Sequence, residues 1–205
     1  MVQVLVIDTV IYDFGNVLIR WNPRLAFLAD DAEADRFFAE FDFAAFNHVM
    51  DSGVMPYGEA RAQVAADSPQ WLPFLDAYVE RYPDSLAEGP VPGSQELVTE
   101  LRAQGFRLFG LTNWWQETFH HALAAAPAIG LMDDVLVSGR VGLAKPNPAI
   151  FRLLIDRFDI NPERTVFIDD SLANIEAASA LGFHTVHFTD TPTLRASLRA
   201  LNVAV

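Results

Sequence analysis

Short apolar runs alternate with segments of helical spacing along most of the chain. The runs are rich in branched and aromatic residues, as buried strands are. They cover residues 10–13, 106–112, 134–138, 165–169 and 185–188. Segments with apolar residues at helical spacing lie between them, at residues 95–104, 116–125, 148–158 and 172–181. This alternation predicts an α/β fold with a mostly parallel sheet and helices on both faces.

One long stretch breaks the alternation. From about Trp21 to Ala87 the pattern is helical, with one clear helical segment at residues 60–66, and it contains no convincing strand. Gly-Pro-Val-Pro-Gly at residues 89–93 is typical of a linker. We therefore expect a Rossmann-like core domain made of residues 1–20 and 88–205, with a small all-helical domain, residues 21–87, inserted after the first strand. The phenylalanines of this insertion are expected to form its core.

Composition and charge limit the classes of function. The chain has 205 residues, 51% of them hydrophobic, and no cysteine, which excludes thiolate catalysis and thiolate metal sites. Its net charge of −13 disfavours nucleic acid and anionic membranes as partners, and an anionic substrate would need a locally positive site. With no signal peptide and no run of about 18 apolar residues, we expect a cytoplasmic protein without a membrane partner. The number of subunits is left open.

Polar side chains follow the ends of the predicted strands. The carboxyl ends of parallel strands meet along one edge, so these side chains are expected to share one crevice. Carboxylates there would repel one another by about 4 kcal/mol per pair at ~4 Å and an effective dielectric near 20. A cation would offset this repulsion, and an all-oxygen site suits Mg²⁺, which also binds phosphate oxygens. The residues are Asp13, Thr112, Asn113, Asp169 and Asp170, with Lys145 before the helix that follows the third strand.

The order of these residues resembles the haloacid dehalogenase superfamily. That superfamily has four ordered motifs: an Asp after a hydrophobic strand, a Ser or Thr after the next, a Lys, and an acidic pair after a later strand. The motif sequences are most similar to those of small sugar-phosphate phosphatases, including the alpha-glucose-1-phosphate phosphatase group. The insertion lies where the family has its type 1 cap. The matching sequences are Tyr-Asp-Phe-Gly-Asn-Val-Leu at 12–18, Leu-Thr-Asn at 111–113, Lys-Pro at 145–146, and Ile-Asp-Asp at 168–170 with Asn174.

The resemblance implies a phosphatase with Mg²⁺ as its cofactor. Its substrate would be a small phosphorylated metabolite, a sugar phosphate by similarity, and the reaction would pass through an aspartyl-phosphate on Asp13. Thr112 would donate a hydrogen bond to a phosphoryl oxygen. Lys145 would neutralise charge on Asp13 and on the transferring group.

The resemblance also implies a metal site with one departure from the usual pattern. Asp13, the backbone carbonyl of Gly15 and Asp170 would ligate Mg²⁺, with Asp169 positioning a metal-bound water. Most phosphatases of the superfamily have a second Asp where this chain has Gly15, and that Asp serves as general acid and base. Such catalysis contributes roughly 10² to 10⁴ in rate. The similar sugar-phosphatase group tolerates this glycine, and His48 is one candidate for the replacement.

Both predicted domains are expected to contribute residues that contact the substrate. Asn16 and Asn113 stand beside the first two motifs. His48 and Asp51 lie in the insertion, and Asp51 and Tyr57 are selected only by their position there.

Two other functions stay open. A 2-haloacid dehalogenase would use Asp13 without a metal, but that subfamily has a Tyr-Gly pair and a carboxylate-binding arginine that Phe14-Gly15-Asn16 does not match. A degenerate member would be a binding module without turnover, although the joint presence of all four motifs argues against it. Asp8 also ends an apolar run, but no glycine turn follows it, so we interpret it as structural.

Overall fold

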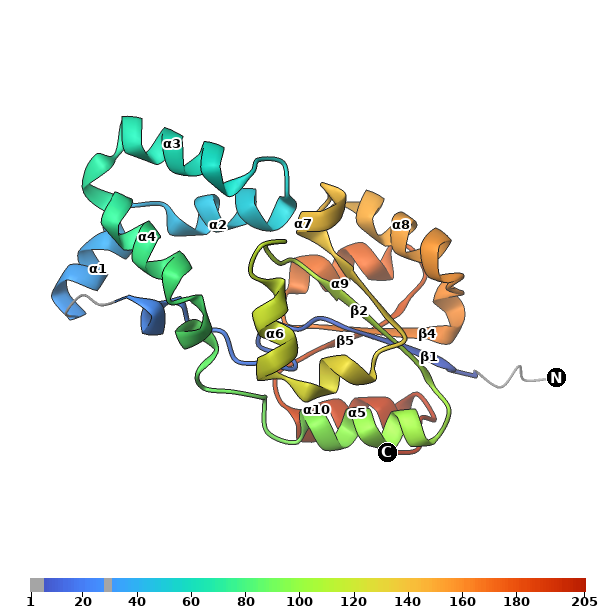
Figure 1. The fold of residues 1–205 in the computed structure, drawn as a ribbon. Coiled ribbons are helices and arrows are strands. Elements are labelled where there is room, and N and C mark those ends of the chain that lie inside the picture. Colours follow the sequence, from blue (N-terminus) through green and yellow to red (C-terminus); the bar gives the residue numbers. More distant parts are fainter. Residues whose placement is uncertain (1–5, 28–30) are drawn as a thin grey trace.

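A parallel sheet forms the centre of the molecule. The computed structural model describes residues 6–27 and 31–205. Five strands lie in the order β3-β2-β1-β4-β5, and every neighbouring pair is parallel (Figure 1). Each strand lies within one residue of a predicted run at both ends, which confirms the five strands and the α/β class. They are β1 (Thr9–Tyr12), β2 (Arg107–Thr112), β3 (Asp134–Val137), β4 (Thr165–Asp169) and β5 (His184–His187).

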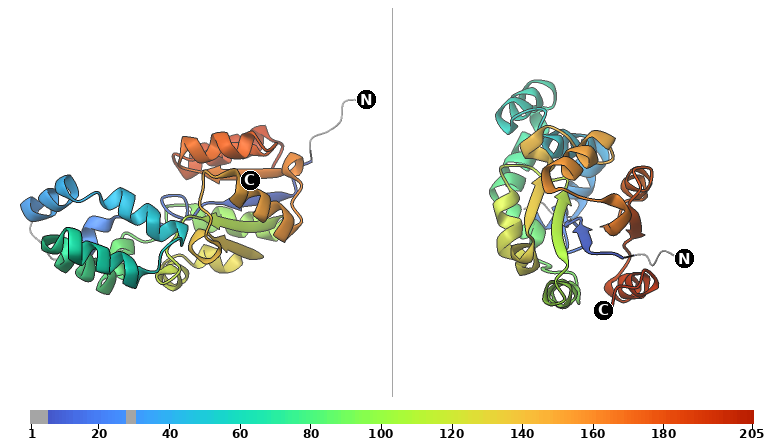
Figure 2. Two further views of the ribbon diagram at one scale, coloured as in Figure 1. Left: turned by 90° about the horizontal axis from the view of Figure 1, so that it is seen from above. Right: turned by 90° about the vertical axis from the view of Figure 1, so that its right-hand side faces the viewer.

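Helices cover both faces of the sheet, because successive strand residues point to opposite sides. On one face, Ile11 belongs to a buried cluster with residues of α8 and α9. On the other, Val10 belongs to a cluster with residues of α5, α6 and α10 (Figure 2). These helices are α5 (Ser94–Ala103), α6 (Phe119–Ala125), α8 (Pro148–Phe158), α9 (Leu172–Ser179) and α10 (Thr191–Ala200), with the short α7 (Ser138–Val141) after β3.

The sequence pattern predicts neither the short helix α7 nor helix α10. The two buried leucines of α10, Leu194 and Leu198, give only a narrow apolar stripe. Its start is nevertheless well defined, because the Asp190 side chain accepts a hydrogen bond from the Thr193 amide at 2.7 Å. Helix α6 also begins later than expected, since residues 116–118 form a turn.

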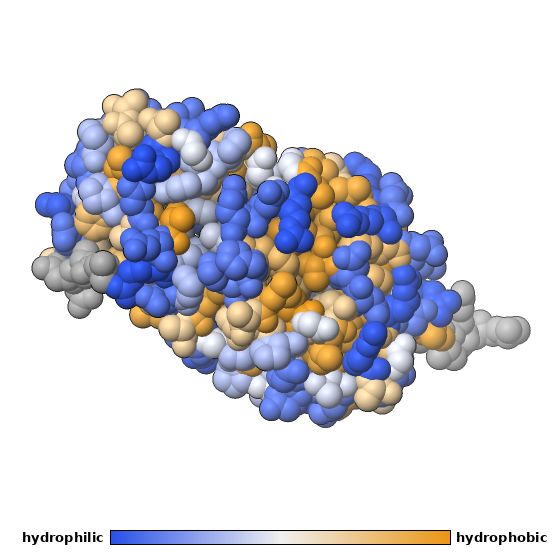
Figure 3. Space-filling model, viewed as in Figure 1, coloured by the Kyte–Doolittle hydropathy of each residue, from blue (hydrophilic) through white to orange (hydrophobic). Residues whose placement is uncertain are grey.

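The described part of the stretch between residues 21 and 87 contains helices joined by turns and no strand. These helices lie beyond the carboxyl end of β1 (Figures 1 and 2). The face in Figure 3 is largely hydrophilic over this part, because its aromatic rings pack inward. Phe37 is fully buried among them, while Phe38 and Phe41 are only partly buried. The helices are α1 (Asp31–Glu40), α2 (Phe43–Ser52), α3 (Tyr57–Asp67) and α4 (Leu72–Glu80), with short 3-10 turns at Pro23–Ala26, Pro69–Trp71 and Tyr82–Leu86.

No helix within the described ranges combines the length and the apolar character that a membrane crossing requires.

Two segments of the chain, at residues 19–20 and 89–90, connect the inserted helices to the core. They run side by side, with an antiparallel bridge between Ile19 and Pro90 and a 3.0 Å hydrogen bond from the Arg20 amide to the Gly89 carbonyl. The end of α2 also touches the core. Gly53 adopts φ 63°, and a Cβ atom there would collide with the backbone of Gly139 in α7. The end of α2 is therefore fixed closely against the core.

Gly110→Ala should destabilise the protein. Gly110 lies in β2 beneath the ring of Phe14, and an added Cβ would overlap that ring. Overpacking of this kind costs about 1–3 kcal/mol, which urea denaturation would measure. Gly58→Ala is the matched control: it lies in α3 with open space around its Cβ position, and should be neutral or slightly stabilising. Equal stability of the two variants would contradict the close packing of Phe14 on β2.

Candidate active site

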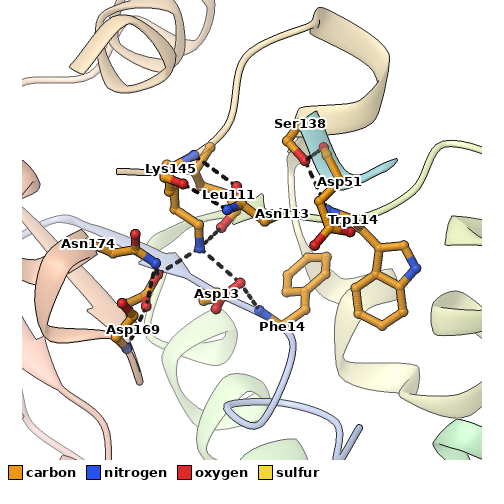
Figure 4. Close-up of polar contacts among 11 residues, drawn as sticks. Asp13, Phe14, Asp51, Leu111, Asn113, Trp114, Ser138, Lys145, Asp169 and Asn174 are labelled. Atoms are coloured by element: carbon orange, nitrogen blue, oxygen red, sulfur yellow. Dashed lines mark hydrogen bonds and ion pairs between the residues drawn. The ribbon is translucent and has the colours of Figure 1, made fainter. Parts of the chain in front are cut away.

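The predicted site residues meet at the carboxyl edge of the sheet. Tyr12 at the end of β1 pairs in register with Gly110 of β2 and Ile168 of β4. The residues that follow these three positions therefore come together. Asp13 lies between the end of β2 and Asp169 (Figure 4). The convergence expected from the strand ends is present.

Lys145 binds three oxygen atoms at the centre of this group. Its ammonium donates hydrogen bonds to the Leu111 carbonyl at 2.8 Å and to Asp169 Oδ2 at 2.6 Å, and it pairs with Asp13 Oδ1 at 3.0 Å. An ammonium has three donors, so all are used. Burial alone lowers the pKa of Lys145, but the charges of Asp13 and Asp169 outweigh it and the pKa is raised. The side chain is 1% exposed and remains a cation.

Asn113 holds the backbone of Lys145. Its Oδ1 accepts a hydrogen bond from the Lys145 amide, and its Nδ2 donates one to the Lys145 carbonyl, both at 2.9 Å. Both ends of the amide thus bind the segment that carries the lysine. The contact of Asn113 with substrate remains a prediction, whereas the structure shows that Asn113 positions Lys145.

Asp13 presents one free carboxylate oxygen. Its Oδ1 accepts a 2.7 Å hydrogen bond from the Phe14 amide as well as pairing with Lys145. Its Oδ2 receives no hydrogen bond or ion pair from the described residues. Burial raises the pKa of Asp13 to about 7; Lys145 opposes this rise, while Asp169 and Asp170 add to it. Added positive charge here would stabilise the ionised carboxylate.

The acidic pair after β4 divides into a buried and an exposed member. Asp169 is fully buried, and its Oδ1 accepts 2.9 Å hydrogen bonds from the Ser171 amide and from Asn174 Nδ2. Its Oδ2 is bound to Lys145. Asp170 is exposed, and its pKa is raised by partial burial and by the charge of Asp169. Asp170 therefore has the more available carboxylate.

The donors at this edge fit Mg²⁺. One carboxylate oxygen from each of Asp13, Asp169 and Asp170 lies within 4.8 Å of the others. The carbonyl of Gly15 accepts no hydrogen bond from the described residues, so it could also bind a cation. Hard oxygen donors of this kind suit Mg²⁺. Because Asp169 already accepts hydrogen bonds at both oxygens, the best available ligands are Asp13, Asp170 and the Gly15 carbonyl.

Thr112 carries a buried hydroxyl without a partner. Its Oγ1 is shielded from solvent and makes no hydrogen bond in the part of the chain that the structure describes. An unpaired buried polar group costs about 1–3 kcal/mol. A phosphoryl oxygen at the end of β2 could satisfy it, in agreement with the role expected from the sequence.

The turn after Asp13 brings Asn16 near the acidic pair. Asn16 has φ 56°, in the left-handed region, and its Oδ1 accepts a 3.2 Å hydrogen bond from the Trp21 amide. A side-chain hydrogen bond from Asn16 to Asp170 opposes the rise in the pKa of that carboxyl. Asn16 is thus placed to orient Asp170, and its contact with substrate stays a prediction.

Helix α2 contributes Asp51 but leaves His48 farther out. Asp51 shares a cavity of about 80 Å³ with Gly15 and Asn113. His48 is exposed and lines a different cavity of about 480 Å³. Tyr57 instead donates a 3.2 Å hydrogen bond to Asp76 within the helical insertion.

Ser138 is a site residue that the sequence reasoning missed. Its hydroxyl donates to the Asp51 carbonyl and accepts a 2.9 Å hydrogen bond from the Trp114 amide (Figure 4). The signal was present, because Ser138 ends the third apolar run as Asp13 ends the first. Asp8, in contrast, precedes β1 and pairs with Arg164 at the opposite end of the sheet.

Comparison with known families identifies the fold. A family model described as haloacid dehalogenase-like hydrolase matches residues 7–182. The chain belongs to the haloacid dehalogenase-like hydrolases. The resemblance found in the four motifs is therefore confirmed, and this hydrolase carries those motifs at the edge of its sheet.

Relatives of this hydrolase include phosphatases and dehalogenases. A sesquiterpene phosphatase of Aspergillus oryzae is 24% identical over 93% of this chain and 94% of its own length. A phosphoglycolate phosphatase of Rhodospirillum rubrum is 28% identical over 84% of this chain and 76% of its own. An (S)-2-haloacid dehalogenase of a Pseudomonas species is 30% identical, over 55% of this chain and 46% of its own.

A solved structure with the same fold is a HAD family enzyme of Bacteroides thetaiotaomicron. Its TM-score to this hydrolase is 0.74, with 19% identity over 93% of this chain and 98% of that chain. Another structure of that enzyme is a complex with magnesium and inorganic phosphate.

Lys145→Met should destabilise the hydrolase by about 3–5 kcal/mol, because it leaves two buried carboxylates without their counterion. Chemical denaturation without added metal would measure the loss. Arg20→Met removes a cation from an exposed pair with Glu88 and should cost less than about 1 kcal/mol. Similar losses in both variants would contradict the central place of Lys145.

Proposed function

We propose that this hydrolase is a phosphatase that cleaves phosphate monoesters through an aspartyl-phosphate on Asp13, with Mg²⁺ as its cofactor. The observation that carries the proposal is the combination of a buried, charged Lys145 paired with Asp13 and the unpaired hydroxyl of Thr112 at the end of the neighbouring strand β2. A nucleophilic carboxylate, a cation and a hydrogen-bond donor at one edge of the sheet are what phosphoryl transfer requires.

The reaction would proceed in two displacements. The Asp13 carboxylate attacks phosphorus, the ester P–O bond breaks, and the alcohol leaves. Water then attacks the phosphorus of the aspartyl-phosphate and frees inorganic phosphate. Lys145 neutralises charge on Asp13 and on the phosphoryl group, and Thr112 binds a phosphoryl oxygen. The chemistry that Mg²⁺ supplies when bound at Asp13, Asp170 and Gly15 is charge neutralisation and polarisation of the phosphoryl group.

The acidic cluster favours this function over dehalogenation. A dehalogenase without a metal would have to hold Asp13, Asp169 and Asp170 near one another with one lysine as counterion. The two phosphatase relatives also match over most of their length, whereas the dehalogenase matches over less than half of its own. The free Asp13 oxygen and the paired lysine argue against a binding module that has lost turnover.

We also propose that residues 21–87 act as a cap that selects the leaving group, while residues 1–20 and 88–205 form the catalytic core. The cavity of about 480 Å³ within this unit has a wall of aromatic rings that includes Trp21, Phe38 and Phe41. Its polar side chains are those of Asp42, Asn47, His48 and Asp51. It joins the smaller cavity beside Gly15, because Asp51 lines both.

The cavity therefore favours a second candidate substrate class, the phosphate ester of an alcohol with a sizeable apolar part. The sesquiterpene phosphatase among the relatives supports this class. The sugar phosphate expected from motif wording is the competing candidate, and both would use the same chemistry at Asp13.

Asp13→Asn should lower turnover of p-nitrophenyl phosphate by at least about a thousandfold, because an amide cannot form the acyl-phosphate. EDTA should abolish wild-type activity and Mg²⁺ should restore it. Asp67→Asn, which changes an exposed carboxylate of α3, is the control and should retain activity. Turnover that survives EDTA or Asp13→Asn would refute the mechanism, and halide release from a 2-haloacid would favour the dehalogenase.

Decyl phosphate should be a better substrate than glucose phosphates, as judged by kcat/KM. Phe41→Ala removes a ring from the cavity wall and should raise KM for decyl phosphate about tenfold, with little change for methyl phosphate, which is too small to reach it. Thermal unfolding of the variant would check that the cap stays folded. A preference for glucose phosphates would instead support the class inferred from the motifs.

A further inference from the structure

Hydrolysis of an unactivated phosphate ester needs a proton donor that Gly15 cannot provide. The departing alkoxide must be protonated, and the attacking water must later lose a proton. The space beside Gly15 is open, because a Cβ atom built there would meet nothing within 4 Å. A carboxyl group from another part of the chain can therefore reach the place where a second aspartate side chain would lie.

Asp51 is the carboxyl group that lines this space. It comes from α2 and shares the cavity of about 80 Å³ with Gly15. Its Oδ2 accepts a 2.7 Å hydrogen bond from Asn47 Nδ2, and Asn47 is itself oriented by a 3.0 Å hydrogen bond from Trp115 Nε1. Its Oδ1 has no hydrogen-bond partner within residues 6–27 and 31–205, and so one oxygen is held and the other is free.

The core fixes the position of Asp51. Ser138, at the start of α7, donates a hydrogen bond to the Asp51 carbonyl and is held by the Trp114 amide. Gly53, two residues further along, packs on Gly139 without room for a side chain. In Figure 4 the Asp51 side chain extends on one side of Asp13, and Asp169 lies on the other. The helix that carries Asp51 is thus anchored at the active-site edge.

We propose that Asp51 is the general acid and base of this hydrolase and replaces the carboxyl group that Gly15 lacks, an inference that rests on the proposed phosphatase function. In the first step the Asp51 carboxylic acid gives its proton to the ester oxygen as the P–O bond breaks and the Asp13–phosphorus bond forms. In the second, the Asp51 carboxylate takes a proton from water as the water oxygen bonds to phosphorus and Asp13 leaves. Inorganic phosphate is released and Asp51 is again protonated.

The surroundings of Asp51 agree with this role. Burial raises the pKa of Asp51 to about 8, and the charge of Asp13 adds to the rise while Lys145 opposes it. The other titratable groups whose electrostatics couple to Asp51 are the buried phenols of Tyr78 and Tyr82. A carboxyl group in this setting is protonated near neutral pH and can donate. His48 is exposed on the larger cavity and has no comparable setting.

Leaving-group dependence distinguishes this role from a structural one. Benzyl phosphate releases an alkoxide that must be protonated, whereas 2,4-dinitrophenyl phosphate releases a phenolate that departs without a proton. In Asp51→Asn, kcat for benzyl phosphate should fall by roughly 10² to 10⁴. The initial burst of dinitrophenolate should keep its rate within about tenfold, and a slow steady state should follow because the second step lacks its base.

The pH profile gives an independent readout. Because the acid must be protonated in the first step, wild-type kcat/KM for benzyl phosphate should fall as the pH rises through about 8. Asp51→Asn should lose this limb of the profile. Gly15→Asp in the Asp51→Asn background should recover part of the benzyl phosphate activity, since the added side chain has room.

Asp67→Asn and His48→Gln separate the outcomes. Asp67→Asn is the control and should match the wild type on both substrates. The proposal would be overturned if His48→Gln, and not Asp51→Asn, lost activity selectively on benzyl phosphate. The proposal would also be overturned if Asp51→Asn slowed the first chemical step equally on both substrates, or on neither. If Asp51→Asn unfolds at a lower temperature, Asp51→Ser must show the same selectivity. Activity independent of Asp13 and Mg²⁺ would refute the phosphatase function itself, which is a different result.

Discussion

The ammonium group of Lys145 is the interaction on which the arrangement of the active site depends. It is buried, and it binds the first strand through Asp13, the second through the Leu111 carbonyl and the fourth through Asp169. Charges that would repel one another are thereby held at one edge of the sheet. Removal from water is costly for each group, and hydrogen bonds to every partner are what make such a cluster tolerable.

Neighbouring groups give this cluster its geometry. Asn113 binds the lysine backbone, Asn174 binds Asp169, and the Phe14 amide binds Asp13. Each uses a short-range contact to orient a charged side chain. Among the described residues, both groups that bind the Asp13 carboxylate, the Phe14 amide and Lys145, contact its Oδ1. Its Oδ2 therefore stays available to a metal ion or a phosphorus atom.

The sequence predicted the parts of the molecule that depend on local pattern. Buried parallel strands appear as short apolar runs, and residues just after them must lie at one edge, so Asp13, Thr112 and Asp169 could be placed together. Helix α10 was missed because only Leu194 and Leu198 mark its buried side. The tasks of Asn113 and Ser138 could not be derived, because they depend on contacts between segments far apart in the chain.

The sequence carries least information about which residues of the cap face the active site. Helical spacing indicates which residues are buried, but not how one helix is turned relative to a site on another domain. Asp51 and His48 lie three residues apart on α2, but only Asp51 also lines the smaller cavity beside Gly15, and this difference depends on how α2 docks. From the sequence, His48 was therefore one candidate for the proton donor, and Asp51 was assigned to substrate contact by its position alone.

The contact between Gly53 and Gly139 restricts how such an enzyme can diversify. A side chain at Gly53 would move α2 away from the core, and one at Gly139 would collide with the backbone of Trp114 and Gln116. Evolutionary change in the cap would then fall on the wall of the larger cavity, which Phe38 and Phe41 line. New leaving groups could be accommodated there by substitution of rings while the end of α2 keeps its register. Substrate range and proton transfer would then be separately adjustable on a single helical insertion.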